Sequence, residues 1–351
     1  MKEFERTHEI REVVGPHATI SLHSVAADVT VRGVDGDEAR IVLRYAMRSP
    51  DDATAGRIDA AFDAAVRRAP GSLEVRSVEG LAMSDLPSVV GSGALAALAR
   101  AFGLASTTRM ELQAELPRGT ALSVETVSGG VGVSGIVGSQ RYRTVSGGLR
   151  LVDVEGDVRI DTTSGSSLVE SPSGLGLEWH SVSGDLRARA ATLATVRLDS
   201  LSGDARLEGR LAPEGDHRMK SVSGALRLAP SDGLVAEVRT LSGGVHSELP
   251  HRVEGTTGRQ LLVVGPGGPR LRFESMSGGL WIGRPVAPER RAAPAPVAPS
   301  PVAADPGPSP DATQGADASS ADERLAILRA VERGEIGVDE AMRRLGTASR
   351  A

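Results

Sequence analysis

The chain has 351 residues, a formal net charge of −5 and a pI of about 5.9, so its overall charge gives no reason to expect a nucleic-acid partner. It contains no cysteine, which excludes disulfides, thiolate metal sites and cysteine nucleophiles. Aromatic residues make up only 2% of the chain and glycine reaches 42 residues, which favours thin, regular layers of aliphatic side chains over one large globular core.

The N-terminal residues are charged and lack the apolar segment of a secretory signal. The most apolar stretch, residues 81–105, is interrupted by charged residues, proline and glycine, whereas a spanning helix needs about 20 predominantly apolar residues. We therefore expect a cytoplasmic protein, with association with the cell envelope as the alternative.

Two different segments precede the main repeat. Residues 18–31 resemble a divergent first coil of that repeat, with SVAAD at 24–28 in the place of the later SVSGD. Residues 51–69 predict a helix, because Ile58, Phe62 and Val66 recur at helical spacing. We expect a helical insertion over about 51–105 that caps or shields one end of the fold; an amphipathic contact with a membrane surface is the alternative.

A five-residue word, of which TVSGG at 126–130 is the first complete copy, recurs along the chain. The serines of its Ser-Gly pairs are separated by 18, 18, 19, 19, 21, 19 and 35 residues. A period near 19 is too short for the common helical repeats and fits one turn of a β-solenoid. These serines are Ser128, Ser146, Ser164, Ser183, Ser202, Ser223, Ser242 and Ser277.

Apolar residues alternate with polar ones on both sides of each Ser-Gly pair, which predicts two half-buried strands per coil joined by a corner. Glycine follows the serine in every copy, either because the backbone needs a positive φ or because the corner leaves no room for a Cβ atom. A hydroxyl two residues before the serine is expected to satisfy backbone groups of the turn. The column four residues before the serine is expected to form a continuous core file: Val124, Tyr142, Ile160, Trp179, Leu198, Met219, Val238 and Phe273.

The 35-residue last interval contains GPGG between two apolar runs, which predicts a hairpin-like excursion before the final coil. The β-solenoid is therefore expected to occupy residues 1–283.

Two outward columns are rich in arginine. We interpret them as a basic stripe for a polyanion such as an anionic lipid headgroup or an acidic envelope polymer; the alternative is a solvated surface on which these arginines pair with intervening carboxylates. The column five residues before the serine contains Arg141, Arg159, Arg197 and Arg218, and the column four residues after it contains Arg150, Arg187, Arg206 and Arg227.

The composition changes after the repeats. Residues 284–320 are rich in proline and alanine without apolar periodicity, which predicts a disordered linker. Residues 321–347 predict a helical hairpin too small to be stable alone, so we expect it to dock on a protein partner, on its own solenoid or on a second copy. Its apolar positions are Leu325, Leu328, Val331, Ile336, Met342 and Leu345.

The repeated [ST]-[VL]-S-G-[DG] strands, with SVAADVTVRGVDGDEARI before them and ELPRGTALSVETVSGG at their entry, resemble the bacterial DUF4097 β-strand repeat family over residues 18–283. The C-terminal hairpin resembles the short SHOCT-like helical module. The resemblance implies a β-solenoid and a non-enzymatic, adhesin-like role, in a family that includes proteins linked to cell-envelope stress.

We therefore expect a non-enzymatic scaffold or interaction module that needs no cofactor or metal. One alternative is a carbohydrate-active solenoid enzyme, which would require two carboxylates about 5–10 Å apart in a groove. Another is a cytoplasmic assembly factor that oligomerises through the C-terminal hairpin.

Overall fold

The structure is a computed structural model that describes residues 2–49, 66–76, 109–256 and 258–284. The chain divides into two units, Met1–Pro288 and Glu289–Ala351, and all described residues belong to the first. Within the described ranges every regular element is a strand. The strands of the N-terminal part are β1 Lys2–Val13, β2 Thr19–Ser24, β3 Asp28–Val34, β4 Glu38–Ser49, β5 Val66–Ala69, β6 Ser72–Arg76, β7 Arg109–Pro117, β8 Ala121–Thr126, β9 Val131–Ser134, β10 Gln140–Thr144, β11 Leu149–Val152 and β12 Gly156–Thr162. The remaining strands are β13 Ser167–Ser181, β14 Leu186–Ser200, β15 Ala205–Leu211, β16 His217–Ser221, β17 Leu226–Pro230, β18 Leu234–Thr240, β19 Val245–Ser247, β20 His251–Thr256, β21 Arg259–Val264, β22 Arg270–Ser275 and β23 Leu280–Ile282.

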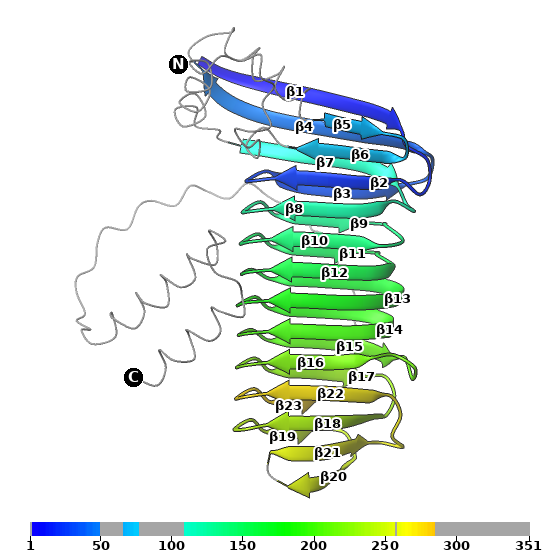
Figure 1. Cartoon of the computed structure of the whole chain (residues 1–351), viewed down its shortest axis with the longest axis vertical. Helices are drawn as coiled ribbons and strands as arrows, with labels where there is room; N and C mark the ends of the chain where they lie inside the picture. Colours follow the sequence, from blue (N-terminus) through cyan, green and yellow to red (C-terminus); the bar gives the residue numbers. More distant parts are fainter. Residues whose placement is uncertain (1, 50–65, 77–108, 257, 285–351) are drawn as a thin grey trace, which may run out of the picture. The chain divides into compact units, whose positions relative to one another are not determined.

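Each Ser-Gly pair is the corner between two short strands of one coil, and successive coils pair in parallel (Figure 1). The strands before the corners form one wall, which we call the first wall; it contains β2, β8, β10, β12, the second halves of β13 and β14, β16, β18 and β22. The strands after the corners form the second wall, with β3, β9, β11, the first halves of β13 and β14, β15, β17, β19 and β23. The expected all-β, solenoid-like architecture is confirmed.

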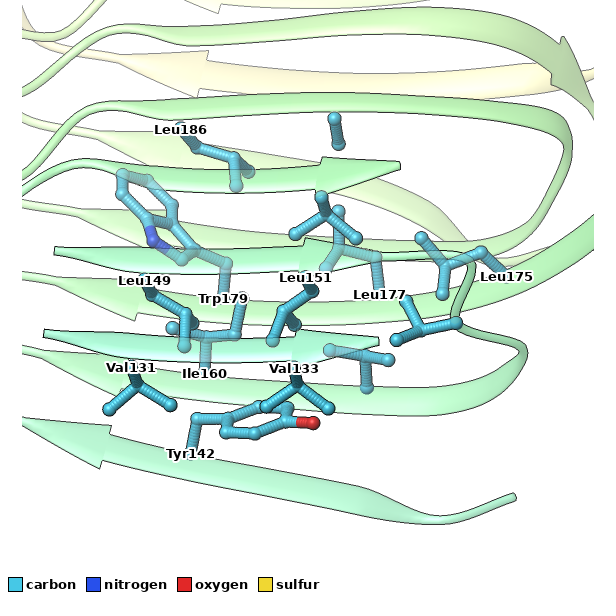
Figure 2. Packing of buried hydrophobic residues seen from close by; sticks show 14 of the residues in the cluster. Val131, Val133, Tyr142, Leu149, Leu151, Ile160, Leu175, Leu177, Trp179 and Leu186 are labelled. Carbon is cyan, nitrogen blue, oxygen red and sulfur yellow. The ribbon is translucent and has the colours of Figure 1, made fainter. Parts of the chain in front are cut away.

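The predicted core file is confirmed. Tyr142 lies in register with Val124 on one side and with Ile160 on the other, and Ile160 lies in register with Trp179. All eight side chains of the file are at most 1% exposed. Figure 2 shows Tyr142, Ile160 and Trp179 on successive strands, facing residues of the second wall such as Leu151. Stacking therefore buries a continuous apolar interior that no single coil could bury alone.

The hydroxyls of the repeated word tie each corner together and attach it to the next coil. The amide of Gly129 donates to the Thr126 hydroxyl within one corner at 3.2 Å. The amide and the hydroxyl of Ser146 both donate to the carbonyl oxygen of Val127 in the preceding coil, at 2.9 and 3.2 Å. The serine is therefore repeated because it bonds one coil to its neighbour, a role that the sequence pattern did not reveal.

Close backbone approach explains most of the repeated glycines. A Cβ atom on Gly147 would overlap the carbonyl oxygen of Gly129, and one on Gly224 would overlap that of Gly203. Only Gly165 and Gly203 among the corner glycines also have a positive φ, of 112° and 143°. Of the two explanations that the sequence left open, lack of room for a side chain therefore applies along the whole column, and positive φ applies at two corners.

The coil nearest the C-terminal end of the stack is not the last one in sequence. β22 pairs with both β16 and β18, and β23 pairs with both β17 and β19. The Ser277 corner therefore lies between the corners of Ser223 and Ser242. The expected hairpin-like excursion is only partly correct. β20 and β21 pair antiparallel with each other, but β21 also pairs antiparallel with β18. The GPGG turn then returns the chain, and β22 inserts between β16 and β18.

The N-terminal segment supplies the first coil, as predicted. β2 pairs with β8 and β3 pairs with β9, while the Ala27 amide donates to the Ser24 hydroxyl at 2.9 Å like the glycine amides of later corners. β7 continues the second wall parallel to β3, and β4 and then β1 add to it by antiparallel pairing.

The predicted helix over 51–69 is wrong where the structure describes it. Residues 66–69 form β5, which pairs antiparallel with β6, and β6 adds to β2 at the end of the first wall. Val66 is buried against the solenoid core, so strand pairing replaces the expected helical periodicity. In the described ranges, no helix is long and apolar enough to span a membrane.

Several predictions fall outside the described residues. They are the rest of the insertion at 51–65 and 77–105, the linker at 285–320 and the SHOCT-like hairpin at 321–347 with its apolar positions. The docking role of that hairpin stays a prediction.

Candidate functional site

The structure divides the eight predicted arginines into two columns on different walls. Arg141, Arg159, Arg197 and Arg218 project outward from the first wall, on β10, β12, β14 and β16. Arg150, Arg187, Arg206 and Arg227 project outward from the second wall, on β11, β14, β15 and β17. Since the apolar core separates the two walls, the eight residues do not form one stripe, and each column is a separate surface.

The arginines of the first wall are paired with carboxylates. Arg159 lies 2.9 Å from Glu178 on the next coil and 3.2 Å from Asp161 on its own strand. Arg141 lies 3.4 Å from Asp161, and Arg218 lies 3.5 Å from Glu274 on the inserted β22. Arg197 similarly pairs with Asp216 at 3.2 Å. This wall therefore matches the alternative interpretation, a surface of paired charges.

The pairing on the first wall perturbs its titrating groups. A hydrogen bond from His180, together with the charge of Arg159, holds the pKa of Glu178 below its ordinary value. The hydrogen bond to Asp161 raises the pKa of Arg159. His180 lies 3.0 Å from Glu178 and 3.5 Å from Asp199, so the charge network crosses from coil to coil.

The second wall leaves part of its arginine column without carboxylate partners. Within the described residues Arg150 and Arg187 form no ion pair and no side-chain hydrogen bond, and both are exposed. Arg206 lies 3.0 Å from Glu208. Arg227 lies 2.6 Å from Asp204, and its guanidinium lies 5.7 Å from the centre of the Trp281 ring. The sequence did not place Trp281 in contact with this column, because that contact depends on the insertion of β23 beside β17.

Strand register places these side chains in one line. Arg187 is in register with Arg206, and Arg206 with Arg227. Arg150 stands one further coil away, since Leu168 lies between it and Arg187. Parallel strands are about 4.8 Å apart, so the column is a row of cations with a fixed short repeat. Such a row fits a linear ligand with regularly spaced negative charges.

The described residues hold no cluster of three or more His, Cys, Asp or Glu side chains suited to a metal ion. Tyr142, whose pKa is raised by burial, donates its hydroxyl hydrogen to the buried Gln140 at 2.8 Å. These two polar groups belong to the core and face no solvent.

Residues 120–263 match the family model described as Toastrack DUF4097. This range contains seven of the corners, from Ser128 to Ser242. The SHOCT-like resemblance of residues 321–347 lies outside it.

Two solved structures are similar to the chain at 10% sequence identity. One is named "putative cell adhesion protein", from Clostridium sporogenes, with 80% of this chain and 100% of that chain covered and a TM-score of 0.23. The other is named "Putative lipid binding protein", from Parabacteroides distasonis, with 80% and 96% covered and a TM-score of 0.31. A comparison with curated proteins gives no match.

Proposed function

We propose that the chain is a non-enzymatic binding module whose second wall binds a linear anionic ligand, either an acidic envelope polymer or an array of anionic lipid headgroups. The observation that supports the proposal most strongly is the exposed second-wall column, in which Arg150 and Arg187 have no carboxylate partner among the described residues. The first wall contains as many arginines of the predicted stripe, but its cations are paired with acids.

The unpaired guanidiniums matter because a ligand need not displace an existing partner. A guanidinium that already contacts a carboxylate offers a ligand little net gain, whereas an exposed one offers a bidentate contact to phosphate or carboxylate. Trp281 extends the column beyond Arg227 and offers an aromatic face beside the charged line. Its exposed ring is 40% accessible.

Binding to a linear polyanion at low and high salt tests this function. The probes are polyphosphate, as a soluble polymer, and vesicles containing phosphatidylglycerol, as a lipid surface. Binding that weakens steeply with added salt is expected, because it rests on exposed charges. Absence of binding to both probes at low salt contradicts the proposal, and binding to one of them identifies the source of the anion.

A matched pair of variants separates the two walls. Arg150→Ala with Arg187→Ala removes two charges from the second wall, and Arg141→Ala with Arg159→Ala removes two from the first. The first pair is expected to weaken binding about tenfold or more and the second to change it little. Equal losses would show that overall charge, rather than this column, determines binding.

A further inference from the structure

The corners carry a second exposed feature besides the charged walls. The residue before each repeated serine lies at the corner itself, and its side chain is exposed at three corners and half-buried at the others. Among the most exposed are Leu241 at 79%, Met276 at 55% and Val127 at 43%. We call this line the corner ridge. In spatial order it contains Val25, Val127, Val145, Thr163, Val182, Leu201, Val222, Met276 and Leu241.

The corner ridge is rigid, because its backbone groups are already satisfied. The carbonyl oxygen of Val222 accepts the Ser277 amide at 2.9 Å, and that of Met276 accepts the Ser242 amide at 3.0 Å. The ridge therefore offers apolar side chains at a fixed spacing of about 4.8 Å, and no free backbone edge. A single exposed valine needs no explanation, whereas this aligned row has eight apolar residues among nine, three of them exposed and five half-buried.

A column of polar side chains borders the corner ridge on the first wall, and carboxylates alternate in it with basic side chains from coil to coil. Its members are in register, and Arg143 lies 2.9 Å from Glu125 of the preceding coil. Each ridge position is thus accompanied by an acidic or a basic side chain. In spatial order the column contains His23, Glu125, Arg143, Asp161, His180, Asp199, Lys220, Glu274 and Arg239.

This order is complementary to its own reverse. When a second copy is turned end for end about an axis between the His180 and Asp199 coils, each basic side chain from Glu125 to Arg239 in one copy meets a carboxylate of the other. The pairs are Glu125 with Arg239, Arg143 with Glu274, Asp161 with Lys220, and His180 with Asp199. A shift by one coil brings like side chains together, and a shift by two restores the pairing over fewer coils, so the stated register is the one that pairs all eight coils.

We infer that the corner ridge is the interface of an antiparallel homodimer, in which two copies pack ridge to ridge about a two-fold axis perpendicular to their stacks. The occupant is a second copy of this chain, because its ridge has the same spacing between coils and its reversed column places basic side chains against carboxylates. The same register places Val127 against Leu241, and Val145 against Met276. On the other side of the ridge this register brings two carboxylates, Asp185 and Asp204, to the same level; each accepts an amide hydrogen bond within its own copy, and Asp204 also pairs with Arg227 at 2.6 Å.

The interface is narrow, which sets its strength. Eight corners at about 4.8 Å give a contact roughly 35 Å long. A strip of that length and one ridge wide buries an area at the low end of the range for specific interfaces. We therefore expect micromolar self-association. The arginine column of the second wall stays exposed in this dimer, so the inference does not depend on the proposed ligand.

Sedimentation of the full chain between about 5 and 500 µM tests association. The mass is expected to rise from 36.3 kDa toward twice that value. Leu241→Glu with Met276→Glu is expected to hold the chain monomeric. Val137→Glu is the control, since Val137 is 41% exposed at the opposite edge of the coil, where β9 leads to β10. A monomer at all concentrations, or equal loss of the dimer with the control, overturns the inference.

A cross-linking experiment tests the direction, and it also detects a dimer formed through any other part of the chain. The protein has no cysteine, so Val127→Cys and Leu241→Cys each provide one thiol. A short bismaleimide is expected to link the two variants when they are mixed, and neither variant to itself. Linkage of each variant to itself indicates a parallel arrangement, and no linkage in a dimeric sample indicates another interface; either result contradicts the inference.

Discussion

The hydroxyl of Ser277 donates a hydrogen bond of 3.3 Å to the carbonyl oxygen of Val222, which lies 55 residues earlier in the chain. The hydroxyls of six other corner serines also donate to the coil next to them in space, and Ser277 does the same; the six are Ser128, Ser146, Ser164, Ser183, Ser223 and Ser242. The bond therefore shows that the last coil in sequence has been inserted between two coils that are consecutive in sequence.

The corner glycines predict a contrast between adjacent residues. Gly147→Ala is expected to lower the free energy of unfolding by about 2 kcal/mol or more, since its Cβ atom would overlap the carbonyl oxygen of Gly129. Gly148→Ala is the control, because a Cβ atom there meets no atom within 4 Å. It is expected to be neutral or to stabilise by up to about 1 kcal/mol. Denaturant unfolding of both variants checks this; equal effects would contradict the close stacking of corners.

The core file predicts a large effect for Trp179, which is fully buried. Trp179→Ala is expected to cost about 3–5 kcal/mol in the free energy of unfolding, because the neighbouring coils cannot close the cavity. Trp281→Ala removes the same side chain from the surface and is expected to cost less than about 1 kcal/mol. Similar losses for both, measured by denaturant unfolding, would be inconsistent with the file.

Acid is expected to weaken the first wall through Glu178. Its pKa in the folded chain lies below the ordinary value of 4.5, owing first to the hydrogen bond from His180 and then to Arg159. A depressed carboxyl pKa stabilises the fold above the unfolded-state value, and this contribution is lost as the pH falls through the folded value. Thermal unfolding of the wild type and Glu178→Gln should therefore differ at about pH 6, and the difference should shrink as the pH falls below the ordinary value of 4.5. A difference that does not change with pH would argue against this pairing.

Much of this fold could be predicted because residues at the same position of successive repeats are buried to the same degree. The column of Tyr142 and Trp179 is apolar in every coil, and the structure buries all of it. The order of the last coils could not be predicted in the same way. Met219, Val238 and Phe273 are all apolar, so any of them can stack on any other, and only the 35-residue interval marked the region as different.

The candidate site was predicted less well, because the residue type at a position of the repeat does not tell which side chains of other coils it contacts. The arginine columns lie on opposite sides of the corner in the sequence, and that spacing already implied two walls. Which arginines are paired depends on side-chain geometry between coils, as for Arg159 with Glu178 at 2.9 Å. The helix expected at 51–69 failed at Val66, where pairing with β6 outweighs a helical pattern of three residues.

Disulfide trapping tests the inserted coil most directly. Arg218 is in register with Arg272, whereas Glu237 lies one coil further on. A disulfide needs Cα atoms about 4.4–6.8 Å apart, a range that neighbouring strands satisfy and next-nearest strands do not. Oxidised Arg218→Cys with Arg272→Cys is therefore expected to form an internal disulfide, and Arg218→Cys with Glu237→Cys is not. The reverse outcome would show that the coils stack in sequence order, and would contradict the structure described here.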